Sequence, residues 1–254
     1  MMVRKAKRLW SGLASGLMVL AILSIAAIAQ ASNTAPVGNQ PGGEEVEADP
    51  WEPFNTKMFS FNRKLDQYVL KPVARVWNFA LPDPVQRSLR NAVDNTKVLA
   101  RLVNSLAQGK WAGAGQEVGR FTINSTVGVA GLFDVAKNGF GIEKSDEDTG
   151  QTLGFYGVGP GPYLVLPLLP PLNVRDGIGS IVDRGLYPLG YLIGFAAEAG
   201  GATAGIMSGI GFTDTVNRRS LNLERYESVE ETVVDLYSAV RNTYLQKREA
   251  KIKE

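Results

Sequence analysis

The side chains that most often carry out chemistry in enzymes are missing from this sequence. Its 254 residues include no histidine and no cysteine. A Ser-His-Asp triad, a thiol nucleophile and zinc sites built from histidine or cysteine are therefore excluded. The remaining candidate is the run Asp146, Glu147 and Asp148, whose carboxylates could bind a hard cation or act as acid and base. Three successive acids in a polar loop are more typical of a solvated loop, so we predict no catalytic residue and no metal site.

Two pairs of adjacent opposite charges, Arg175-Asp176 and Asp183-Arg184, could contact a lipid headgroup or could join the ends of helices. We favour the structural role for both pairs. The glycines at 157, 159 and 161 are not a dinucleotide-binding fingerprint because Pro162 follows them, and the chain has no phosphate-binding loop motif. We therefore predict no cofactor.

The stretch from Gln151 to Asp176 is unusual because it is rich in glycine, proline and leucine. Five of the twelve residues from 150 to 161 are glycine, and five of the chain's thirteen prolines follow within residues 160–171. Because both residue types oppose helix formation, we predict an irregular, extended segment without a long helix. Its apolar side chains indicate that this backbone is buried or lines a cavity, with helices packed around it.

The first 31 residues have the features of a secretory signal peptide. Four basic residues precede an apolar stretch, and Ala29-Gln30-Ala31 forms an A-x-A cleavage site. An uncleaved membrane anchor is the alternative. Without this segment 23 basic residues face 25 acidic ones, so nucleic-acid binding is not indicated. Residues 32–48 have almost nothing to bury, which predicts a flexible linker.

Helical patterns begin at residue 49. Asp49 as N-cap with Pro50 in the first helical position predicts one start, and a start at Pro53 is the alternative. An apolar seam at helical spacing follows, and aromatic residues at such spacing usually belong to a core. In the alternative interpretation, the off-seam residues Asn55, Phe59 and Asn62 face lipid. The seam consists of Trp51, Phe54, Met58, Phe61, Leu65 and Tyr68.

Further helices are predicted in the middle of the chain. Pro72 should break or kink the first helix, and a helix capped by Asp83 should run to Gly109. The polar face of that helix, which includes Lys97 and Arg101, is expected to be solvated. A glycine-weakened helix is expected to follow from residue 111 to about residue 128.

The C-terminal pattern predicts a last amphipathic helix with acidic residues before basic ones, as the helix dipole favours. Its start could be a capping box of Ser228 and Glu231, or could lie near Ser220.

Residues 185–212 are almost uncharged, with Glu198 as the one charged side chain and eight glycines. Small residues spaced by four are common where helices approach closely in membranes. We predict two short helices within one leaflet or a buried hairpin, and we regard a spanning helix as the least favoured alternative. The membrane-embedding candidates are Leu186, Tyr191, Leu192, Ile193, Phe195, Ile206, Met207, Ile210 and Phe212.

Two dense motifs, in the expected order, resemble the signature of the MlaA (VacJ) family. The first motif reads DPWEPFN from Asp49, followed by MF at 58–59 and FN at 61–62. The second reads TLG at 152–154, YGVG at 156–159, GPY at 161–163, LP at 166–167 and RD at 175–176. The resemblance extends from about Asp49 to about Arg248.

The resemblance implies a ring-like helical protein whose amphipathic channel passes phospholipid from the outer membrane to an MlaC-like periplasmic lipid carrier. It implies a membrane location, with an outer-membrane porin as a companion. No energy-coupling motif is present in the sequence, so passage would be passive. The lipid-passage candidates are Asn55, Phe59, Asn62, Gly154, Tyr156, Gly157, Gly159 and Tyr163.

The sequence departs from the family at its anchor. Many members carry a lipid-modified cysteine after the signal, whereas this chain has no cysteine. We therefore expect cleavage after Ala31 and a location at the periplasmic face of the outer membrane without acylation through cysteine.

The sequence thus predicts a mostly α-helical protein with one glycine- and proline-rich extended stretch. We expect one compact, partly membrane-embedded domain over residues 49–249 and a short tail at 250–254. The predicted function is phospholipid passage that maintains outer-membrane lipid asymmetry, without enzyme activity. An enzyme acting on envelope lipids through carboxylates and a purely structural envelope protein are the rival classes.

Overall fold

The computed structural model describes residues 49–189, 191 and 200–254. The predicted signal peptide and linker lie outside the described residues. Residues 49–155 and 159–254 form one compact unit, which is the subject of the following paragraphs.

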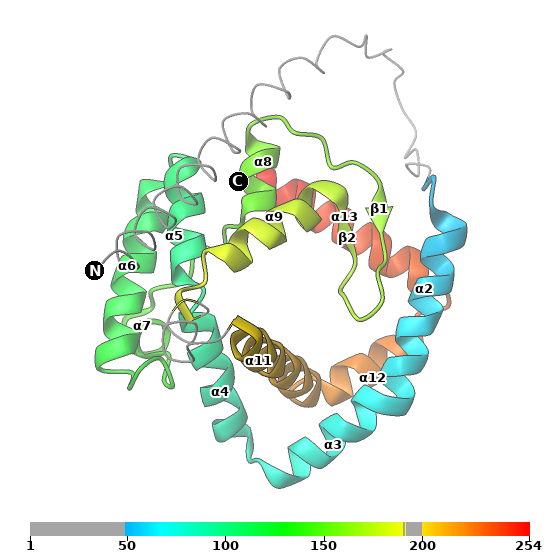
Figure 1. Cartoon of the computed structure of the whole chain (residues 1–254), viewed down its shortest axis with the longest axis horizontal. Helices are drawn as coiled ribbons and strands as arrows, with labels where there is room; N and C mark the ends of the chain where they lie inside the picture. The colour runs from blue at the N-terminus through cyan, green and yellow to red at the C-terminus, as the bar shows by residue number, and fades with distance from the viewer. Residues whose placement is uncertain (1–48, 190, 192–199) are drawn as a thin grey trace. The chain divides into compact units, whose positions relative to one another are not determined.

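Helices make up most of this unit, so the prediction of a mostly α-helical fold is confirmed (Figure 1). The described strands form one antiparallel pair. In chain order the elements are α2 (Glu52–Leu65), the π-helix η1 (Asp66–Leu70), α3 (Lys71–Ala80), α4 (Asp83–Asn95), α5 (Val98–Ala107), α6 (Trp111–Thr126), α7 (Val135–Phe140), α8 (Thr149–Phe155), β1 (Tyr163–Leu164), β2 (Leu172–Asn173), α9 (Val174–Gly185), α11 (Gly200–Ser220), α12 (Leu223–Thr232) and α13 (Leu236–Lys253).

The first helix begins between its two predicted starts. Asp49 accepts a hydrogen bond from the Trp51 N–H at 2.9 Å, and α2 starts at Glu52 with Pro53 in its first turn. The predicted break at Pro72 is replaced by continuous helical backbone. The π-helix η1 directly precedes α3, and Pro72 lies in the first turn of α3. Proline and a π-helical turn are both recognised causes of a kink in a helix.

The helix predicted from Asp83 to Gly109 is in fact two helices, α4 and α5, separated at Thr96 and Lys97. The Thr96 hydroxyl donates to the Val93 carbonyl at 2.7 Å, which offers the backbone a local alternative to the helical ladder. Helix α6 agrees with its predicted range. Helix α7 was not predicted, and the Asp134 side chain caps it by accepting from the Lys137 N–H at 3.2 Å.

The central stretch differs from its prediction in two ways. Its first residues, including Gly154, are helical because they belong to α8. Residues 163–173 form a hairpin in which Tyr163 pairs with Asn173 and Leu164 with Leu172. The expected burial is wrong at the hairpin tip, where the Leu168 side chain is exposed and its φ is +65°.

The C-terminal region contains two helices rather than one. Helix α12 ends at Thr232, and Asp235 caps α13 by accepting from the Ser238 N–H at 3.2 Å. The predicted capping box at Ser228 is therefore wrong. Helix α13 continues to Lys253, so most of the residues expected to form a tail are helical.

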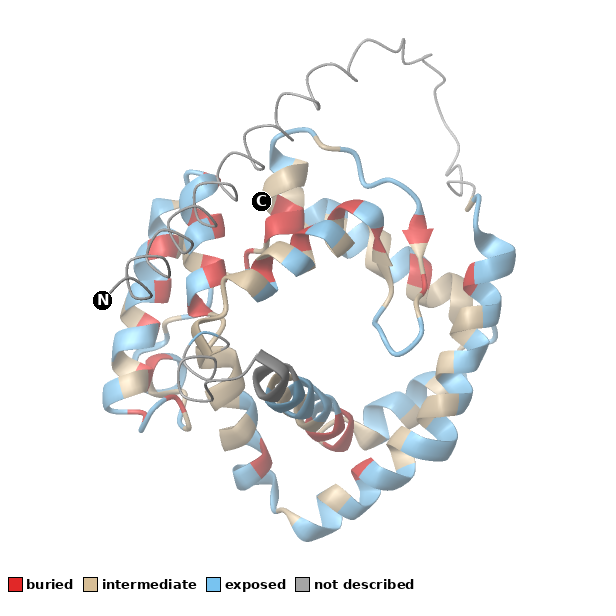
Figure 2. Cartoon of the chain, viewed as in Figure 1, coloured by how far each residue is buried: buried red, intermediate tan, exposed pale blue. Residues whose placement is uncertain are grey.

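The interior of the unit is mostly polar. Nineteen polar or charged side chains are buried but only eight apolar ones, and no leucine, isoleucine or phenylalanine of the described residues is among those eight. By contrast, thirty-two large apolar side chains of the described residues are exposed. Figure 2, in which exposed residues are pale blue, shows that much of α2 and α3 is exposed. This distribution is the reverse of that in a soluble globular domain, where large apolar side chains supply the core.

Candidate functional site

The aromatic seam of α2 faces outward. Trp51, Phe54, Phe61 and Tyr68 are all exposed, so the prediction that the seam is core is wrong. The helix is amphipathic as predicted, but the pattern does not specify what covers the apolar face. The exposed face continues along α3, where Phe79 is 93% exposed. An apolar surface of this extent marks a site of contact with lipid or with another protein.

A face of α2 that lies beside the apolar seam contacts the hairpin through two amides. The Asn55 amide donates to the Tyr163 carbonyl at 2.9 Å, and its oxygen accepts from the Val165 N–H at 2.9 Å. Asn62 repeats this arrangement with the Leu166 carbonyl at 2.8 Å and the Leu168 N–H at 2.9 Å. Both amides therefore satisfy backbone groups of the hairpin, as a neighbouring strand would. Their role in lipid passage remains a prediction.

Two tyrosines of α13 contact the same hairpin at Tyr163. The Tyr163 ring lies 6.3 Å from that of Tyr237 and 5.8 Å from that of Tyr244, between ring centroids. Phe59 also contacts Tyr237, edge to face at 5.7 Å. Burial raises the pKa of Tyr163 to about 12, so this phenol is neutral at physiological pH. Tyr163 and Phe59 are thus brought together as predicted site residues, in an aromatic cluster.

Hydrogen bonds tie this cluster to carboxylates at both ends. The Tyr237 hydroxyl donates to Asp49, and the Tyr244 hydroxyl donates to Asp176. Burial raises the pKa of Asp49, but hydrogen bonds from Tyr237, Asn55 and the Trp51 N–H outweigh burial and place it below its usual value. Asp49 therefore stays ionised and fixes the position of Asn55, whose amide lies 3.0 Å from it.

The charge pair Arg175-Asp176 is structural, as favoured from the sequence. The two side chains are 3.0 Å apart, and Arg248 of α13 adds an ion pair to Asp176 at 2.6 Å. In the second pair, Asp183-Arg184, the acid accepts hydrogen bonds from neutral side chains of other elements. Asp183 accepts from the Thr149 hydroxyl at 2.6 Å and from the Asn104 amide at 3.0 Å. Burial raises the pKa of Asp183 above its ordinary value.

The acidic run at 146–148 is not a solvated loop, which corrects the prediction. Glu147 is buried and pairs with Lys110 at 2.9 Å. Asp148 accepts two hydrogen bonds from Arg248, and Asp146 pairs with Lys251. The run therefore connects the loop before α8 with Lys110, which lies between α5 and α6, and with α13. In the part of the chain that the structure describes, no group of acidic residues is arranged to hold a metal ion.

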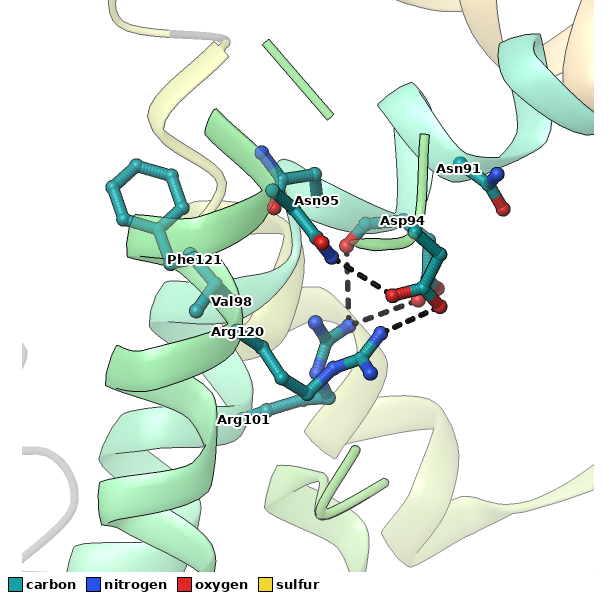
Figure 3. Close-up of a pocket in the computed structure, with 9 residues that line it drawn as sticks. Asn91, Asp94, Asn95, Val98, Arg101, Arg120 and Phe121 are labelled. Atoms are coloured by element: carbon teal, nitrogen blue, oxygen red, sulfur yellow. Dashed lines mark hydrogen bonds and ion pairs between the residues drawn. The ribbon is translucent and has the colours of Figure 1, made fainter. Parts of the chain in front are cut away.

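The predicted solvated face of α4 and α5 is likewise buried in part. Arg101 of α5 pairs with Glu117 of α6 at 2.7 Å, and the Glu117 side chain is fully buried. Figure 3 shows Arg101 and Arg120 beside Asp94 at a neighbouring polar pocket. The cavity there has a volume of about 20 Å³, which is room for one water molecule. This polar interior could not be read from the sequence, because the partner of Arg101 lies on another helix.

The predicted lipid-passage residues of the central stretch divide into two groups. A Cβ atom at Gly154 would lie 2.7 Å from the end of the Ile252 side chain and 2.9 Å from that of Arg175, so these side chains would have to move. A Cβ atom at Gly157 or Gly159 would have no neighbour within 4 Å, although Gly157 has a φ of +85°. Tyr156 is exposed.

The membrane-embedding candidates are only partly described. Leu192, Ile193 and Phe195 lie outside the described residues. Tyr191 is exposed, and its hydroxyl donates to the Gly185 carbonyl at 2.6 Å. No helix within the described ranges has both the length and the hydropathy needed to cross a membrane. The remaining candidates are exposed or half-buried: Leu186, Ile206, Met207, Ile210 and Phe212.

One cluster that was missed in the sequence joins α3, α4 and α11. The Trp77 indole donates to the Asn217 oxygen at 3.0 Å, and the Asn217 amide donates to the Gln86 carbonyl at 2.7 Å. Gln86 and Asn217 are both almost fully buried. An amide at a helical position gives no signal in a single sequence, because exposed and buried amides look alike there.

Comparison with known proteins agrees with this architecture. The family model described as MlaA lipoprotein matches residues 47–251. The intermembrane phospholipid transport system lipoprotein MlaA of Haemophilus influenzae is 31% identical over 208 residues, covering 81% of this chain and 80% of that protein. The protein of the same name from Escherichia coli is 36% identical over 151 residues, covering 58% and 59%.

The structural comparison gives the same result. A solved structure from a study of how bacterial outer-membrane lipid asymmetry is maintained matches with a TM-score of 0.70 and 30% identity. The match covers 81% of this chain and the whole of that chain. The family model and the relative from H. influenzae each cover most of this sequence. The chain therefore belongs to the MlaA family.

Proposed function

We propose that this protein passes phospholipid passively between the outer membrane and a soluble periplasmic lipid carrier, and so maintains outer-membrane lipid asymmetry. The observation that carries the proposal is the reversed distribution of side chains, with charged and amide groups buried and large apolar groups exposed. A surface of this kind is stable against acyl chains and unfavourable in water. The relatives from H. influenzae and E. coli, whose names describe intermembrane phospholipid transport, support the same function.

The two halves of a phospholipid match the two kinds of surface. Acyl chains would contact the apolar faces of α2 and α3, while the phosphate-containing headgroup would contact polar groups. We propose that the lipid leaves unchanged, and the ion pairs that occupy the acidic run at 146–148 support this proposal. Direction would come from partners, such as an inner-membrane transporter that acts through an MlaC-like periplasmic carrier. An outer-membrane porin would be a companion in the membrane.

The proposed location is the periplasmic face of the outer membrane, reached after cleavage at Ala31. The relatives' names describe lipoproteins, whereas the printed sequence has no cysteine. We infer that exposed apolar side chains, rather than an acyl chain on cysteine, provide the attachment. The intact mass of the exported protein tests this inference, since a retained leader or an added acyl mass would contradict it.

The function itself is tested by the lipid that accompanies the purified protein. We expect mass spectrometry to find intact phospholipid, and we expect the loaded protein to deliver labelled phospholipid to acceptor vesicles that contain a purified carrier. Lysophospholipid in place of intact lipid would instead support an enzyme. Absence of both lipid and transfer would support a purely structural protein.

A further inference from the structure

A second cavity, separate from the hairpin, lies where α5, α9, α11 and α13 approach the loop before α8. Its volume is about 220 Å³, compared with about 20 Å³ for the small pocket at Arg120. Unlike the small pocket at Arg120, this cavity is large enough for a polar group such as a phosphate. Its lining residues are Asp94, Lys97, Ala100, Arg101, Lys144, Asp146, Glu147, Asp148, Asp183, Tyr187, Arg218 and Lys251.

Most of the acids that line the cavity are already engaged by groups outside it. Glu147 pairs with Lys110, Asp148 with Arg248, and Asp183 accepts from Thr149 and Asn104. Cations outside the cavity therefore offset the charge of Glu147 and Asp148, whereas the donors to Asp183 are neutral side chains. The two that remain are Asp94 and Asp146.

The cations are less well satisfied. Lys97 reaches its nearest carboxylate, Asp214, only at 4.0 Å, and Arg218 already contacts the same carboxylate oxygen at 2.9 Å. Lys144 lies 3.4 Å from Asp146, which is also in close contact with Lys251. It also lies 3.9 Å from Asp94, which Arg101 shares at 3.7 Å. Two lysines thus face the cavity with long ion-pair contacts to acids that other cations share.

Desolvation adds to this imbalance. Burial lowers the pKa of Lys97, and the neighbouring Arg218 lowers it further, whereas the carboxylates Asp214 and Asp94 raise it. An anion placed between Lys97 and Arg218 would relieve the repulsion. Burial also raises the pKa of Tyr187, so its hydroxyl remains protonated and can donate a hydrogen bond to an anion.

We propose that Lys97, Lys144 and Arg218 bind the phosphate of a phospholipid headgroup in this cavity. The inference rests on the proposed transport function, because it assigns one polar binding site for the lipid that is passed. Inorganic phosphate carries the same chemistry, so the two sources must be separated by experiment. The nearby carboxylates Asp94 and Asp146 would favour a headgroup that also carries a cationic amine.

The test uses the purified full chain in detergent and a soluble short-chain phosphatidylethanolamine, followed by calorimetry. Replacement of one cation in the Lys97→Gln protein should weaken binding about tenfold, as expected for the loss of a charge-assisted contact. Lys144→Gln should act in the same direction, and because this side chain is more exposed it tests the site even if Lys97→Gln fails to fold. The matched control is Lys137→Gln, an exposed lysine paired with Glu143, which should leave binding unchanged.

Two further ligands identify the source of the phosphate. Short-chain diacylglycerol, which lacks the phosphate, should bind the wild type and Lys97→Gln equally. Inorganic phosphate should compete with the short-chain phospholipid. Phosphate binding without phospholipid binding would overturn the headgroup assignment and leave a free-phosphate site.

Equal phospholipid affinity in Lys97→Gln, Lys144→Gln and Lys137→Gln would also overturn the inference. That outcome leaves the transport function intact if the wild type still carries and transfers phospholipid. If the wild type neither carries nor transfers lipid, the proposed function fails instead.

Discussion

The α2–α3 region and the region built from α5, α6, α8, α9 and α13 use amphipathic helices in opposite ways. In α2 and α3 large apolar side chains such as Phe61 and Phe79 are exposed, and the one buried side chain of α2 is the amide Asn55. In the second region ion pairs such as Arg101–Glu117 and Arg248–Asp148 are turned inward. The difference teaches that an amphipathic pattern establishes two faces but does not determine which face is covered by the protein.

The largest expected effect is on the polar interior. Glu117→Gln removes the charge that neutralises Arg101 in a buried position, which should lower the free energy of unfolding by about 3–5 kcal/mol. Chemical denaturation in detergent measures this change. Lys137→Gln breaks an exposed pair and should cost only about 0–1 kcal/mol. Equal losses in the two variants would mean that the buried pair does not distinguish the interior from the surface.

The glycines of the central stretch allow a sharper comparison. Gly154→Val should destabilise the protein by about 1–3 kcal/mol, because the new side chain overlaps Ile252 and Arg175 at the contact of α8 with α13. Gly159→Val enters open space and should change the unfolding free energy by less than about 0.5 kcal/mol.

Outer-leaflet phospholipid and protein level should be measured together in cells that carry each glycine variant. If residue 159 lines a lipid path, Gly159→Val should disturb the lipid distribution at a normal protein level. A normal distribution would remove this residue from the mechanism.

A smaller effect is expected in the pH dependence of the free energy of unfolding, through Asp176 of the second region. Burial raises the pKa of Asp176, but hydrogen bonds from Arg248 and Tyr244 outweigh burial and place it below the usual 3.8. The unfolded state therefore binds the proton more readily, so this contribution is complete above about pH 4 and is lost as the pH falls through the folded-state pKa. Asp176→Asn should flatten the acid limb of the stability curve.

The smallest effect on stability is expected at the apolar face. Phe79→Ser should change the unfolding free energy in detergent by less than about 0.5 kcal/mol, because the ring is almost fully exposed. Membrane partitioning should nevertheless weaken by about tenfold, since burial of one phenylalanine contributes about 1.5–3 kcal/mol. Wild-type protein should resist release by high salt and be released by detergent. A marked loss of stability would show that Phe79 belongs to a packed core.

What could be predicted from the sequence follows from the range of the interactions involved. The range of α6, the seam of α2 and the structural role of Arg175-Asp176 depend on local spacing, and these predictions are correct as patterns. The direction of the seam is not local, because it depends on whether lipid or protein covers it. The partners of Arg101 and Asp183 lie on other helices, so the sequence could not show that these charges are buried. The hairpin amides were found as off-seam residues, but their contacts more than a hundred residues away were not.

The two amides of α2 also act as a ruler for the hairpin. Asn55 and Asn62 are seven residues apart, which is about 10.5 Å along a helix. The two backbone positions that they bind are three residues apart, and three residues of extended chain span about 10 Å. One residue inserted between the amides would rotate the second by about 100° around the helix and disengage it from the hairpin. The length of this helical segment is therefore constrained even at positions whose side chains contact nothing in the protein, so its tolerance to insertions should be far lower than its tolerance to substitutions.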